Sequence, residues 1–371
     1  TPDWQKRFYD RFNFNPLVWH SDISKKQRIN IWLAALNGSA PVIVGARSAL
    51  LIPILNLGLI IVDEEHEPAF KQEESVRYNA RDMAVFKAMK SSAPIVLASA
   101  TPSLETFHNM KLGKYIHLTL PKRATGAEMP DIRLLDLKSN PPNKGCWISP
   151  VLVDEIKDRL IKKEQSLLFL NRRGYSPLRV CNSCGTKVKC RNCDAWLVEH
   201  RSAGALICHH CGFNKIISNI CEGCGKKDQM QSCGPGVERI TEEVKKIFPE
   251  AKLITLSSDT MKSQNLLVDS INKIKSGEID IIIGTQMIAK GHDFPNLKLV
   301  GIIDSDIGLS GGDLRASERS FQLLQQVSGR SGRHSSSTND KGLVILQTFD
   351  PENPIIKAIA KNDRKSFFEN E

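Results

Sequence analysis

The chain has 371 residues, which is too long for one ordinary hydrophobic core and predicts two or three domains. Hydrophobic residues make up 41% and charged residues 25%, a balance that excludes an intrinsically disordered chain. The 51 Lys and Arg residues outnumber the 41 Asp and Glu residues, and the net charge of +10 favours a polyanionic partner, nucleic acid first, over charge that serves only solubility.

The longest apolar stretch, 50–62, is interrupted by Pro53, Asn56 and Gly58. It is shorter than the roughly 20 residues that cross a bilayer, which excludes a transmembrane protein and a membrane partner.

Short apolar runs predict buried strands, and amphipathic stretches between many of them predict helices. The predicted strands are 40–45, 57–62, 94–98, 132–137, 166–170, 252–256, 280–284, 297–303 and 342–347, and the predicted helices are 24–36, 80–89, 151–163, 237–248, 265–274 and 315–327. Most of the apolar runs lack the alternation of a one-sided sheet, so we expect both faces of the sheets to be covered. The order of the elements predicts an α/β fold with parallel sheets rather than a single large α+β domain.

The middle of the chain interrupts this pattern. Residues 180–225 contain few apolar runs and four pairs of cysteines, and residues 121–143 are rich in Pro, Lys and Arg. We therefore expect a first lobe over residues 1–120, a linker and the start of a second lobe over 121–179, a cysteine-rich insertion over 180–225, and the remainder of the second lobe over 226–371.

Four Cys-x-x-Cys pairs form the most specific local pattern. They are Cys181 with Cys184, Cys190 with Cys193, Cys208 with Cys211, and Cys221 with Cys224. Two such pairs complete a tetrahedral Cys₄ zinc site, so the eight thiolates predict two zinc ions. Iron–sulfur ligation is the rival interpretation, but it more often uses irregular spacing with unpaired cysteines.

The spacing of the pairs suggests how they combine. Five residues separate the first pair from the second, whereas fourteen separate the second from the third, which is typical of a zinc ribbon. We favour a nested arrangement, with Cys190, Cys193, Cys208 and Cys211 around one ion and Cys181, Cys184, Cys221 and Cys224 around the other. Cys146 and Cys233 are interpreted as ordinary thiols, and His209 and His210 are possible substitute ligands.

An acidic segment, Asp63-Glu64-Glu65-His66, follows the predicted strand 57–62 directly. The carboxyl ends of strands are where α/β sheets bind ligands, so Asp63 could hold Mg²⁺ through water and Glu64 could orient a water that attacks a γ-phosphate. An ordinary acidic loop end is the alternative. A second predicted strand ends in Ser99-Ala100-Thr101, a hydroxyl-bearing segment suited to coupling a nucleotide site to a neighbouring lobe.

Two arginines near the end of the chain complement these carboxylates. Arg330 and Arg333 lie three residues apart beside Gly329 and Gly332. Guanidinium groups at this spacing could bind phosphate oxygens from a second lobe as arginine fingers. A basic helix end with an ordinary glycine stop is the alternative interpretation.

Taken together, these segments resemble motifs II, III, V and VI of superfamily 2 helicases. The matching residues are 63–66, 99–101, 284–293 and 326–333. The cysteine pairs, with Asn-Arg-Arg-Gly-Tyr at 171–175, Gly-Pro-Gly-Val-Glu-Arg at 234–239 and Arg-Ala-Ser-Glu-Arg at 315–319, extend the resemblance to the helicase core of the PriA family of replication-restart helicases over essentially the whole chain. The resemblance implies two RecA-like helicase lobes with parallel sheets, the first of them truncated, and a zinc-binding insertion in the second.

The resemblance also implies roles for single residues. Asp63 would bind Mg²⁺, Glu64 would activate water, and Arg330 and Arg333 would contact the triphosphate. The residues that would couple ATP to DNA are His66, Ser99, Thr101, Thr285, Gln286, Lys290 and Gln326, and those that would contact DNA are Arg77, Tyr78, Arg172 and Arg173.

The resemblance also implies an activity for the intact protein. The intact protein would be an ATP-dependent 3′-to-5′ DNA helicase that binds single-stranded and forked DNA, unwinds the lagging-strand arm of stalled forks and initiates primosome assembly. The cofactors would be two Zn²⁺ ions and Mg²⁺ with ATP. The partners would be DNA, primosome proteins and the single-stranded DNA-binding protein, in the bacterial cytoplasm at the nucleoid.

The sequence departs from the family in two places. It contains no Gly-x-x-x-x-Gly-Lys-Ser/Thr loop, and it begins with Thr1, so we expect it to start inside a larger protein and to be inactive as an ATPase by itself. A catalytically silent, zinc-dependent DNA-binding or scaffold fragment is therefore the alternative function. The loop after the acidic segment has Val76 where the family usually has Trp, which predicts weaker base stacking there.

Overall fold

In the computed structural model the chain forms two compact units, residues 1–111 and 112–371. The residues that it describes are 2–72, 76–123, 125–170, 178–193, 196–200, 204–208, 211–233, 236–257, 264–289, 293–306, 309, 314–334 and 341–371. No helix within these ranges is long and apolar enough to cross a membrane.

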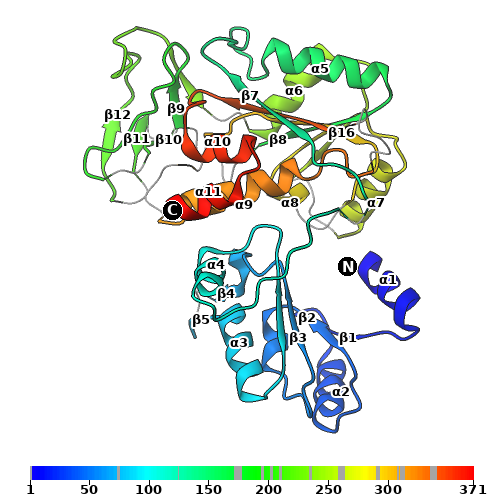
Figure 1. Cartoon of the computed structure of the whole chain (residues 1–371). Helices are drawn as coiled ribbons and strands as arrows, with labels where there is room; N and C mark the ends of the chain where they lie inside the picture. Colours follow the sequence, from blue (N-terminus) through cyan, green and yellow to red (C-terminus); the bar gives the residue numbers. More distant parts are fainter. Residues whose placement is uncertain are drawn as a thin grey trace. The chain divides into compact units, whose positions relative to one another are not determined.

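The first unit contains three small sheets with helices around them (Figure 1). Its elements are α1 (Pro2–Phe12), β1 (Leu17–Trp19), α2 (Lys25–Leu36), β2 (Ile43–Gly45), β3 (Ile60–Asp63), β4 (Lys71–Gln72), β5 (Tyr78–Asn79), α3 (Ala80–Lys90), β6 (Ile95–Ala98) and α4 (Leu104–Lys111), with short 3₁₀ turns at Arg47–Leu51 and Pro68–Phe70. Strands β1 and β2 are parallel, as are β3 and β6, whereas β4 and β5 form an antiparallel hairpin. The α2 helix begins in a capping box, in which Ser24 and Gln27 satisfy each other's backbone amides.

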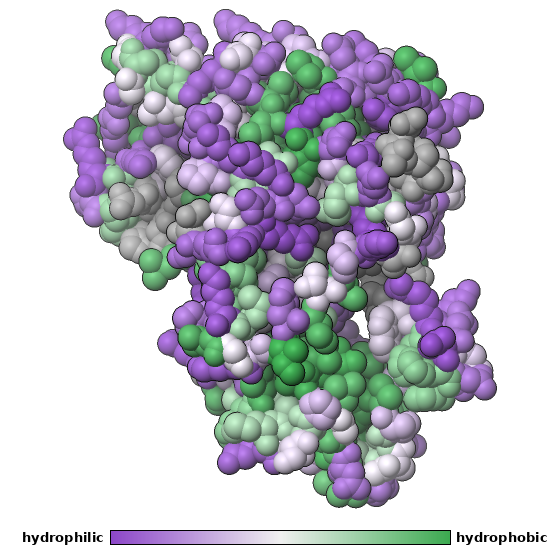
Figure 2. All heavy atoms as spheres, viewed as in Figure 1, coloured by the Kyte–Doolittle hydropathy of each residue, from purple (hydrophilic) through white to green (hydrophobic). Residues whose placement is uncertain are grey.

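The expectation that both faces of the sheets are covered is wrong for β3 and β6. Helix α3 packs on one face, where Val62 is 7% exposed. On the other face Ile61 and Val96, which are paired in register, remain 64% and 47% exposed. Figure 2 shows hydrophobic side chains at the surface over this unit. An unbroken apolar run therefore identified the strands but not which of their faces is packed.

The second unit is built around a six-stranded sheet in the order β14–β15–β8–β16–β17–β7, and every pair of neighbours in it is parallel. Its strands are β7 (Asp131–Asp136), β8 (Gln165–Phe169), β14 (Leu253–Leu256), β15 (Ile281–Gly284), β16 (Leu297–Ile302) and β17 (Leu343–Thr348). All residues of β8, β15, β16 and β17 are buried, so the expectation of a covered parallel sheet is confirmed here.

Helices lie on both faces of this sheet (Figure 1). They are α5 (Pro150–Ile161), α6 (Val237–Ile247), α7 (Gln264–Lys275), α8 (Gln286–Ala289), α9 (Ala316–Ser328), α10 (Pro354–Ala360) and α11 (Arg364–Asn370). Residues of α5 and α6 join the sheet in one apolar core, for example Leu152 and Ile240, which are fully buried. Helix α9 packs against α8 and α10, and Phe321 of α9 stacks on Phe367 of α11 at 4.0 Å between ring centroids.

A cysteine-rich module follows β8 in the chain. Its strands are β9 (Leu178–Cys181), β10 (Val198–His200), β11 (Ala205–Ile207), β12 (Asn214–Ile216) and β13 (Met230–Cys233), and they form one antiparallel sheet in the order β12–β11–β10–β9–β13. The module therefore departs from the carboxyl end of a central strand of the parallel sheet. The predicted α/β fold with parallel sheets and a cysteine-rich insertion is confirmed.

Candidate functional site

The acidic segment lies at the carboxyl end of β3, as the sequence predicts. Asp63 is the last residue of the strand, and its Oδ1 accepts a hydrogen bond from the backbone amide of Glu64 at 3.0 Å. Glu64 has a φ of +49°, a left-handed conformation that costs a non-glycine residue about 1–3 kcal/mol. Both carboxylates are exposed. The turn thus presents two carboxylates to solvent at a strained position, an arrangement suited to binding a hydrated cation.

His66 joins this segment to the residues that follow β6. Its Nδ1 lies 2.6 Å from the Ser99 Oγ and 3.6 Å from the Glu64 Oε2, and its side chain is 4% exposed. The Ser99 Oγ also accepts a hydrogen bond from the Thr101 amide at 2.9 Å. The structure therefore brings His66, Ser99 and Thr101, three of the predicted coupling residues, into one cluster with Glu64.

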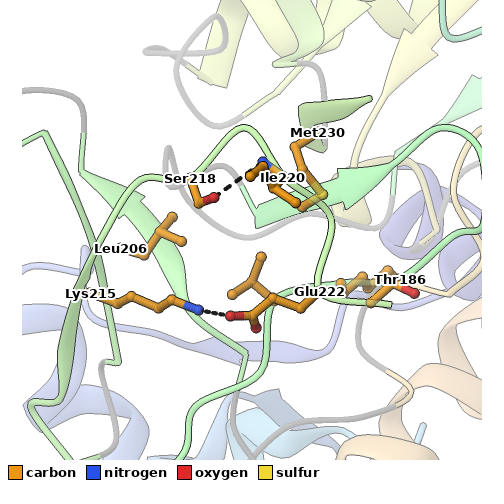
Figure 3. A pocket seen from close by; sticks show the side chains of 9 residues that line it. Thr186, Leu206, Lys215, Ser218, Ile220, Glu222 and Met230 are labelled. Carbon is orange, nitrogen blue, oxygen red and sulfur yellow. Dashed lines mark hydrogen bonds and ion pairs between the residues drawn. The ribbon is translucent and has the colours of Figure 1, made fainter. Parts of the chain in front are cut away.

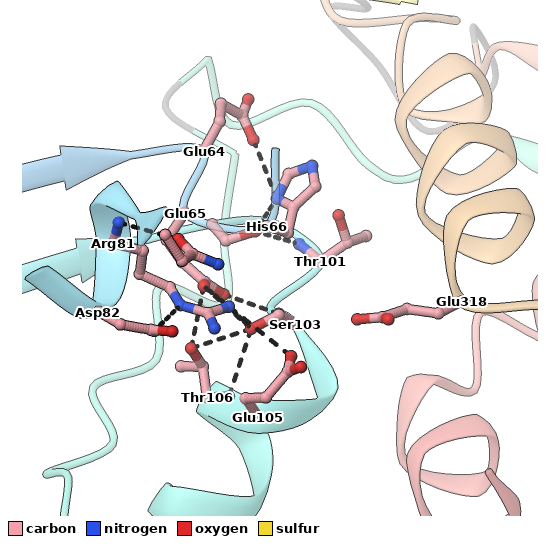
Figure 4. A network of polar contacts seen from close by, with 12 residues as sticks. Glu64, Glu65, His66, Arg81, Asp82, Thr101, Ser103, Glu105, Thr106 and Glu318 are labelled. Carbon is pink, nitrogen blue, oxygen red and sulfur yellow. Dashed lines mark hydrogen bonds and ion pairs between the residues drawn. The ribbon is translucent and has the colours of Figure 1, made fainter. Parts of the chain in front are cut away.

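Sequence reasoning missed a buried network directly behind this cluster (Figure 4). Glu65 has a fully buried side chain, and its carboxylate accepts hydrogen bonds from the Ser103 amide at 2.7 Å, the Ser103 hydroxyl at 3.0 Å and the Thr106 hydroxyl at 2.9 Å. Arg81 of α3 lies 3.3 Å from Glu65 and donates to the Asp82 carboxylate at 2.8 Å. The network ties the acidic turn to the start of α4.

The charge state of Arg81 follows from its neighbours. Burial alone lowers the pKa of Arg81, but the carboxylates of Asp82, Glu65 and Glu105 together raise it above its ordinary value. The pair is thus a buried salt bridge, and removing either partner would leave an uncompensated charge. No local motif marks Arg81 in the sequence, because its partner Glu65 is sixteen residues away.

Two of the predicted DNA-contacting residues, Arg77 and Tyr78, lie at β5. Tyr78 begins β5 and is half-buried, Arg77 before it is exposed, and Val76 is 74% exposed. Arg172 and Arg173 lie outside the described residues, as does Lys290 of the predicted coupling set.

The remaining predicted coupling residues lie in the second unit. Thr285 follows β15 directly and donates its amide to the Leu256 carbonyl at 3.3 Å, and Gln286 begins α8. Gln326 lies in α9, against which α8 packs. Beyond these helices Asp293, the last residue of predicted motif V, lies 2.6 Å from His334, which directly follows predicted motif VI.

The two predicted arginine fingers differ in exposure. Arg330 is 7% exposed, whereas Arg333 is half-buried and its Nε donates to the Gly329 carbonyl at 3.1 Å. Both lie in the turn that follows α9. The carboxylates belong to the first unit and the arginines to the second.

The eight paired cysteines form two tetrads. Cys181, Cys184, Cys221 and Cys224 make one, here called the inner site, and Cys190, Cys193, Cys208 and Cys211 make the other, the outer site; within each tetrad all four sulfurs lie within 4.8 Å of one another. These are the two sets that the spacing favours.

The sulfur positions fit a tetrahedral metal. A zinc ion with Zn–S bonds of about 2.3 Å requires sulfurs about 3.8 Å apart. The Sγ atoms of Cys181 and Cys224 lie 3.7 Å apart, and those of Cys193 and Cys208 lie 3.5 Å apart. A full Cys₄ set leaves no open coordination position, so these sites suit a structural rather than a catalytic zinc.

Glycine shapes three of the four cysteine turns. Gly185, Gly212 and Gly225 follow the second cysteine of their pairs with φ values of +76°, +75° and +71°. A side chain is strained in this left-handed region, and glycine is not. In the inner site, burial raises the pKa of Cys184, but hydrogen bonds from the side chain and backbone of Thr186 outweigh it and lower the pKa to about 6. A lowered thiol pKa favours the thiolate form in which cysteine binds a metal.

The inner site lies against the parallel sheet. A Cβ on Gly185 would lie 2.9 Å from the Phe349 Cβ, so the turn packs directly on the residue that follows β17. The carboxylate of Asp306, after β16, accepts the Phe349 amide at 2.8 Å. Burial and then Asp304 raise the pKa of Asp306, while the charge of Lys187, two residues beyond Gly185, lowers it.

An ion-pair cluster beside a small pocket connects the two tetrads, and Lys215 and Glu222 of this cluster line the pocket (Figure 3). Glu222, inside the last pair of the inner site, contacts Lys215 of β12 and lies 3.8 Å from Arg191, inside the first pair of the outer site. The hydrogen bond from Lys215 lowers the pKa of Glu222. Charged side chains thus bridge the turns of the two sites.

Comparison with known proteins identifies the family. A family model described as the PriA DNA helicase Cys-rich region (CRR) domain matches residues 190–215, and a helicase conserved C-terminal domain model matches residues 224–335. The replication restart protein PriA of Rickettsia conorii is 45% identical over 365 residues, which make up 98% of this chain and 56% of that protein. The chain belongs to the PriA family. PriA of Bacillus subtilis is 38% identical and is matched over 100% of this chain and 46% of its own length, so the chain spans about half the length of these relatives.

A solved structure has a similar fold. The DUF1998 helicase MrfA bound to DNA aligns with a TM-score of 0.50 and 13% identity, over 100% of this chain and 41% of MrfA. At this identity the likeness concerns the fold alone. It agrees with the α/β architecture of the two units.

Proposed function

We propose that the chain is the helicase portion of an ATP-dependent 3′-to-5′ DNA helicase that restarts stalled replication forks. It would bind single-stranded and forked DNA, unwind the lagging-strand arm and initiate primosome assembly with partner proteins, including the single-stranded DNA-binding protein, at the bacterial nucleoid. The observation that carries this proposal is the 2.6 Å contact between His66 and Ser99, because it links the carboxylates at the end of β3 to the hydroxyl segment at the end of β6 in a PriA family chain.

Each group has a definite role in this proposal. Asp63 would hold Mg²⁺ through water, and Glu64 would orient the attacking water. The magnesium ion would neutralise charge on the phosphates of ATP. Arg330 and Arg333 would contact those phosphates, and Gln326 would help to seat the nucleotide. The residues that relay the nucleotide state toward DNA would be His66, Ser99, Thr101, Thr285, Gln286 and Lys290, and those that contact DNA would be Arg77, Tyr78, Arg172 and Arg173.

The two tetrads would hold zinc away from the chemistry. We expect them to stabilise a module that engages DNA junctions and partner proteins. Chelation of zinc should then reduce unwinding more than ATP hydrolysis stimulated by single-stranded DNA.

Steady-state ATP hydrolysis by the intact protein, with and without single-stranded DNA, tests the proposal. Glu64→Gln and Arg333→Ala should each lower DNA-stimulated turnover by about a hundredfold or more, because each removes a group that acts in the transition state. Glu250→Gln and Arg11→Ala change the same residue types at exposed positions outside these motifs and should leave turnover unchanged. Wild-type turnover in either test variant would refute the catalytic assignment.

The alternative function is a silent, zinc-dependent DNA-binding scaffold. An intact protein that binds forked DNA in a zinc-dependent manner, but does not hydrolyse ATP with any DNA, would establish that function instead.

A further inference from the structure

Arg123 lies in the segment that leads from the first unit into the second, and its contacts converge on the arginine turn. One terminal nitrogen of its guanidinium donates to the Ser331 carbonyl at 3.2 Å and to the Gly332 carbonyl at 3.1 Å, and the other donates to the Gly329 carbonyl at 3.1 Å. One half-buried side chain thus binds three carbonyls within four consecutive residues.

Thr125 adds a fourth contact from the same segment. Its hydroxyl donates to the Arg333 carbonyl at 2.5 Å. Between them, Arg123 and Thr125 bind four of the five backbone carbonyls from Gly329 to Arg333.

The opposite side of this turn is fixed to the parallel sheet. The Ser331 hydroxyl donates to the Lys298 carbonyl at 2.8 Å, and the Gly332 amide donates to the Leu297 carbonyl at 2.8 Å. Helix α9 ends immediately before the turn, and carbonyls at a helix end need donors from outside the helix. The turn is therefore held between the sheet and the segment that contains Arg123.

The charges of Arg123 and Arg333 indicate which of the two suits an anion. Burial lowers the pKa of Arg123, and so does the nearby positive charge of Arg333. Two cations that are held this close repel each other, and an anion that binds Arg333 would relieve the repulsion. Because the terminal nitrogens of Arg123 face backbone carbonyls, this residue suits holding the turn rather than contacting phosphate itself.

We propose that Arg123 is a positioning residue for ATP hydrolysis, which fixes the backbone of the turn that presents Arg330 and Arg333. The inference rests on the proposed function, since it assigns a holder to the arginines that would contact the triphosphate. Arg123 also lies in the segment that follows the first unit, so a displacement of this segment pulls directly on the arginine turn.

Two measurements on the intact protein test this role, with Arg123→Ala, Arg123→Lys and the adjacent exposed control Lys122→Ala. Amide hydrogen exchange over 329–334 should accelerate by about tenfold in Arg123→Ala, since the carbonyl contacts are lost, while exchange in β8 stays unchanged. The kcat for DNA-stimulated ATP hydrolysis should fall by about tenfold or more with little change in KM, because a misplaced arginine loses contact mainly in the transition state. Lys122→Ala should behave as wild type.

The remaining variants separate positioning from charge and from folding. Arg123→Lys keeps the charge but cannot span three carbonyls, so its kcat should lie closer to that of Arg123→Ala than to that of wild type. Adding Arg123→Ala to Arg333→Ala should lower kcat by a smaller factor than Arg123→Ala does in wild type, because only Arg330 is then left for the turn to position.

Failure of the inference and failure of the proposed function give different results. A wild-type protein without DNA-stimulated hydrolysis would refute the proposed function, while the exchange experiment would still test the contact. Unchanged exchange over 329–334, an equal rise in exchange throughout the second unit, or a kcat within twofold of wild type in an active protein would each overturn the role of Arg123.

Discussion

The inner and outer cysteine sites have the same ligands but different surroundings. In each tetrad the first and third cysteines are buried, the second is half-buried and the fourth is exposed. The outer site has an apolar cluster of its own, with Leu197 and Leu206 buried and Phe213 packed against them. The inner site has a smaller cluster around Met230, and its Gly185 turn packs on Phe349 of the parallel unit.

This difference separates two uses of the same metal chemistry. A structural metal stabilises whatever its ligands connect. The outer site connects residues within the module and can stabilise only that module. The inner site connects strands β9 and β13 of the module to a turn that rests on the loops after β16 and β17. Its metal should therefore affect the carboxyl edge of the sheet, where α/β proteins bind ligands.

The largest expected effect comes from removing one metal at a time. The double variant Cys221→Ser, Cys224→Ser should lower zinc content from two ions to one and raise amide exchange over 304–306 and 348–350 by about a hundredfold, as expected when a contact worth about 3 kcal/mol is lost. The matched double variant Cys208→Ser, Cys211→Ser should also lose one zinc ion but leave these loops protected. Equal exchange in both variants would remove the distinction between the sites.

Three glycine substitutions sharpen the comparison without touching a ligand. An alanine at Gly185, Gly212 or Gly225 meets similar left-handed strain, of about 1 kcal/mol. Only at Gly185, among these three, would the new Cβ lie within 4 Å of another residue, namely Phe349. Gly185→Ala should therefore lower the free energy of unfolding by about 2–3 kcal/mol, and Gly212→Ala and Gly225→Ala by about 1 kcal/mol each.

Gly225→Ala is the decisive control, because Gly225 belongs to the same inner site as Gly185. Denaturant unfolding with a zinc assay would measure all three variants. The excess cost of Gly185→Ala should shrink in a Phe349→Gly background, since the Phe349 Cβ that the new side chain would meet at 2.9 Å is then absent. An excess that persists there would place the cost in the turn and not at the contact with the sheet.

The sequence predicted the elements of the fold well where a strong local pattern exists. Strands β15 and β17 contain unbroken apolar runs, and the spacing of the paired cysteines favoured the two tetrads that the structure shows. The strands of the cysteine-rich module were not predicted, because they are short and are held by antiparallel pairing and cysteine turns rather than by long apolar runs.

The candidate site shows the same division between local and distant interactions. Asp63 and Glu64 were predicted because they follow a strand within one acidic segment, and His66 was predicted through the resemblance to helicase motif II. Glu65 was passed over although it is the buried residue of that segment, since only the fold brings Arg81 and Ser103 to it. Arg123 lies more than 200 residues from the carbonyls that it binds, and no spacing could indicate that contact.

A smaller effect should appear in the pH dependence of stability. Burial, and then Asp304, raise the pKa of Asp306 above its unfolded value. The stability contribution of this carboxyl is therefore fully present below about pH 4 and is lost as the pH rises through the raised pKa. Asp306→Asn cannot titrate, so its melting temperature relative to wild type should be higher at pH 7 than at pH 4.

Lys187 provides the control for this titration. The positive charge of Lys187 lowers the pKa of Asp306 and so offsets part of its rise. Without this charge the pKa would rise further, so the Lys187→Ala variant should lose more stability between pH 4 and pH 7 than wild type does. Thermal unfolding of Asp306→Asn, Lys187→Ala and the double variant would separate the two groups. If Lys187→Ala left the pH profile unchanged, the inner site would contact the sheet through Gly185 and not through this charge pair.

The smallest expected effect concerns the bridge between the two sites. Glu222 contacts Lys215 and Arg191, but it and Arg191 are 51% and 72% exposed, so Glu222→Gln should change the free energy of unfolding by no more than about 0.5 kcal/mol. The lowered pKa of Glu222 places its contribution above the unfolded value of about 4.3, and the contribution is lost as the pH falls through the folded value. Zinc content should stay at two ions at every pH from 6 to 8 (roughly the range in which thiolate ligands persist). Loss of outer-site zinc from Glu222→Gln alone would mean that this ion-pair bridge, and not each site's own surroundings, sets the stability of the outer tetrad.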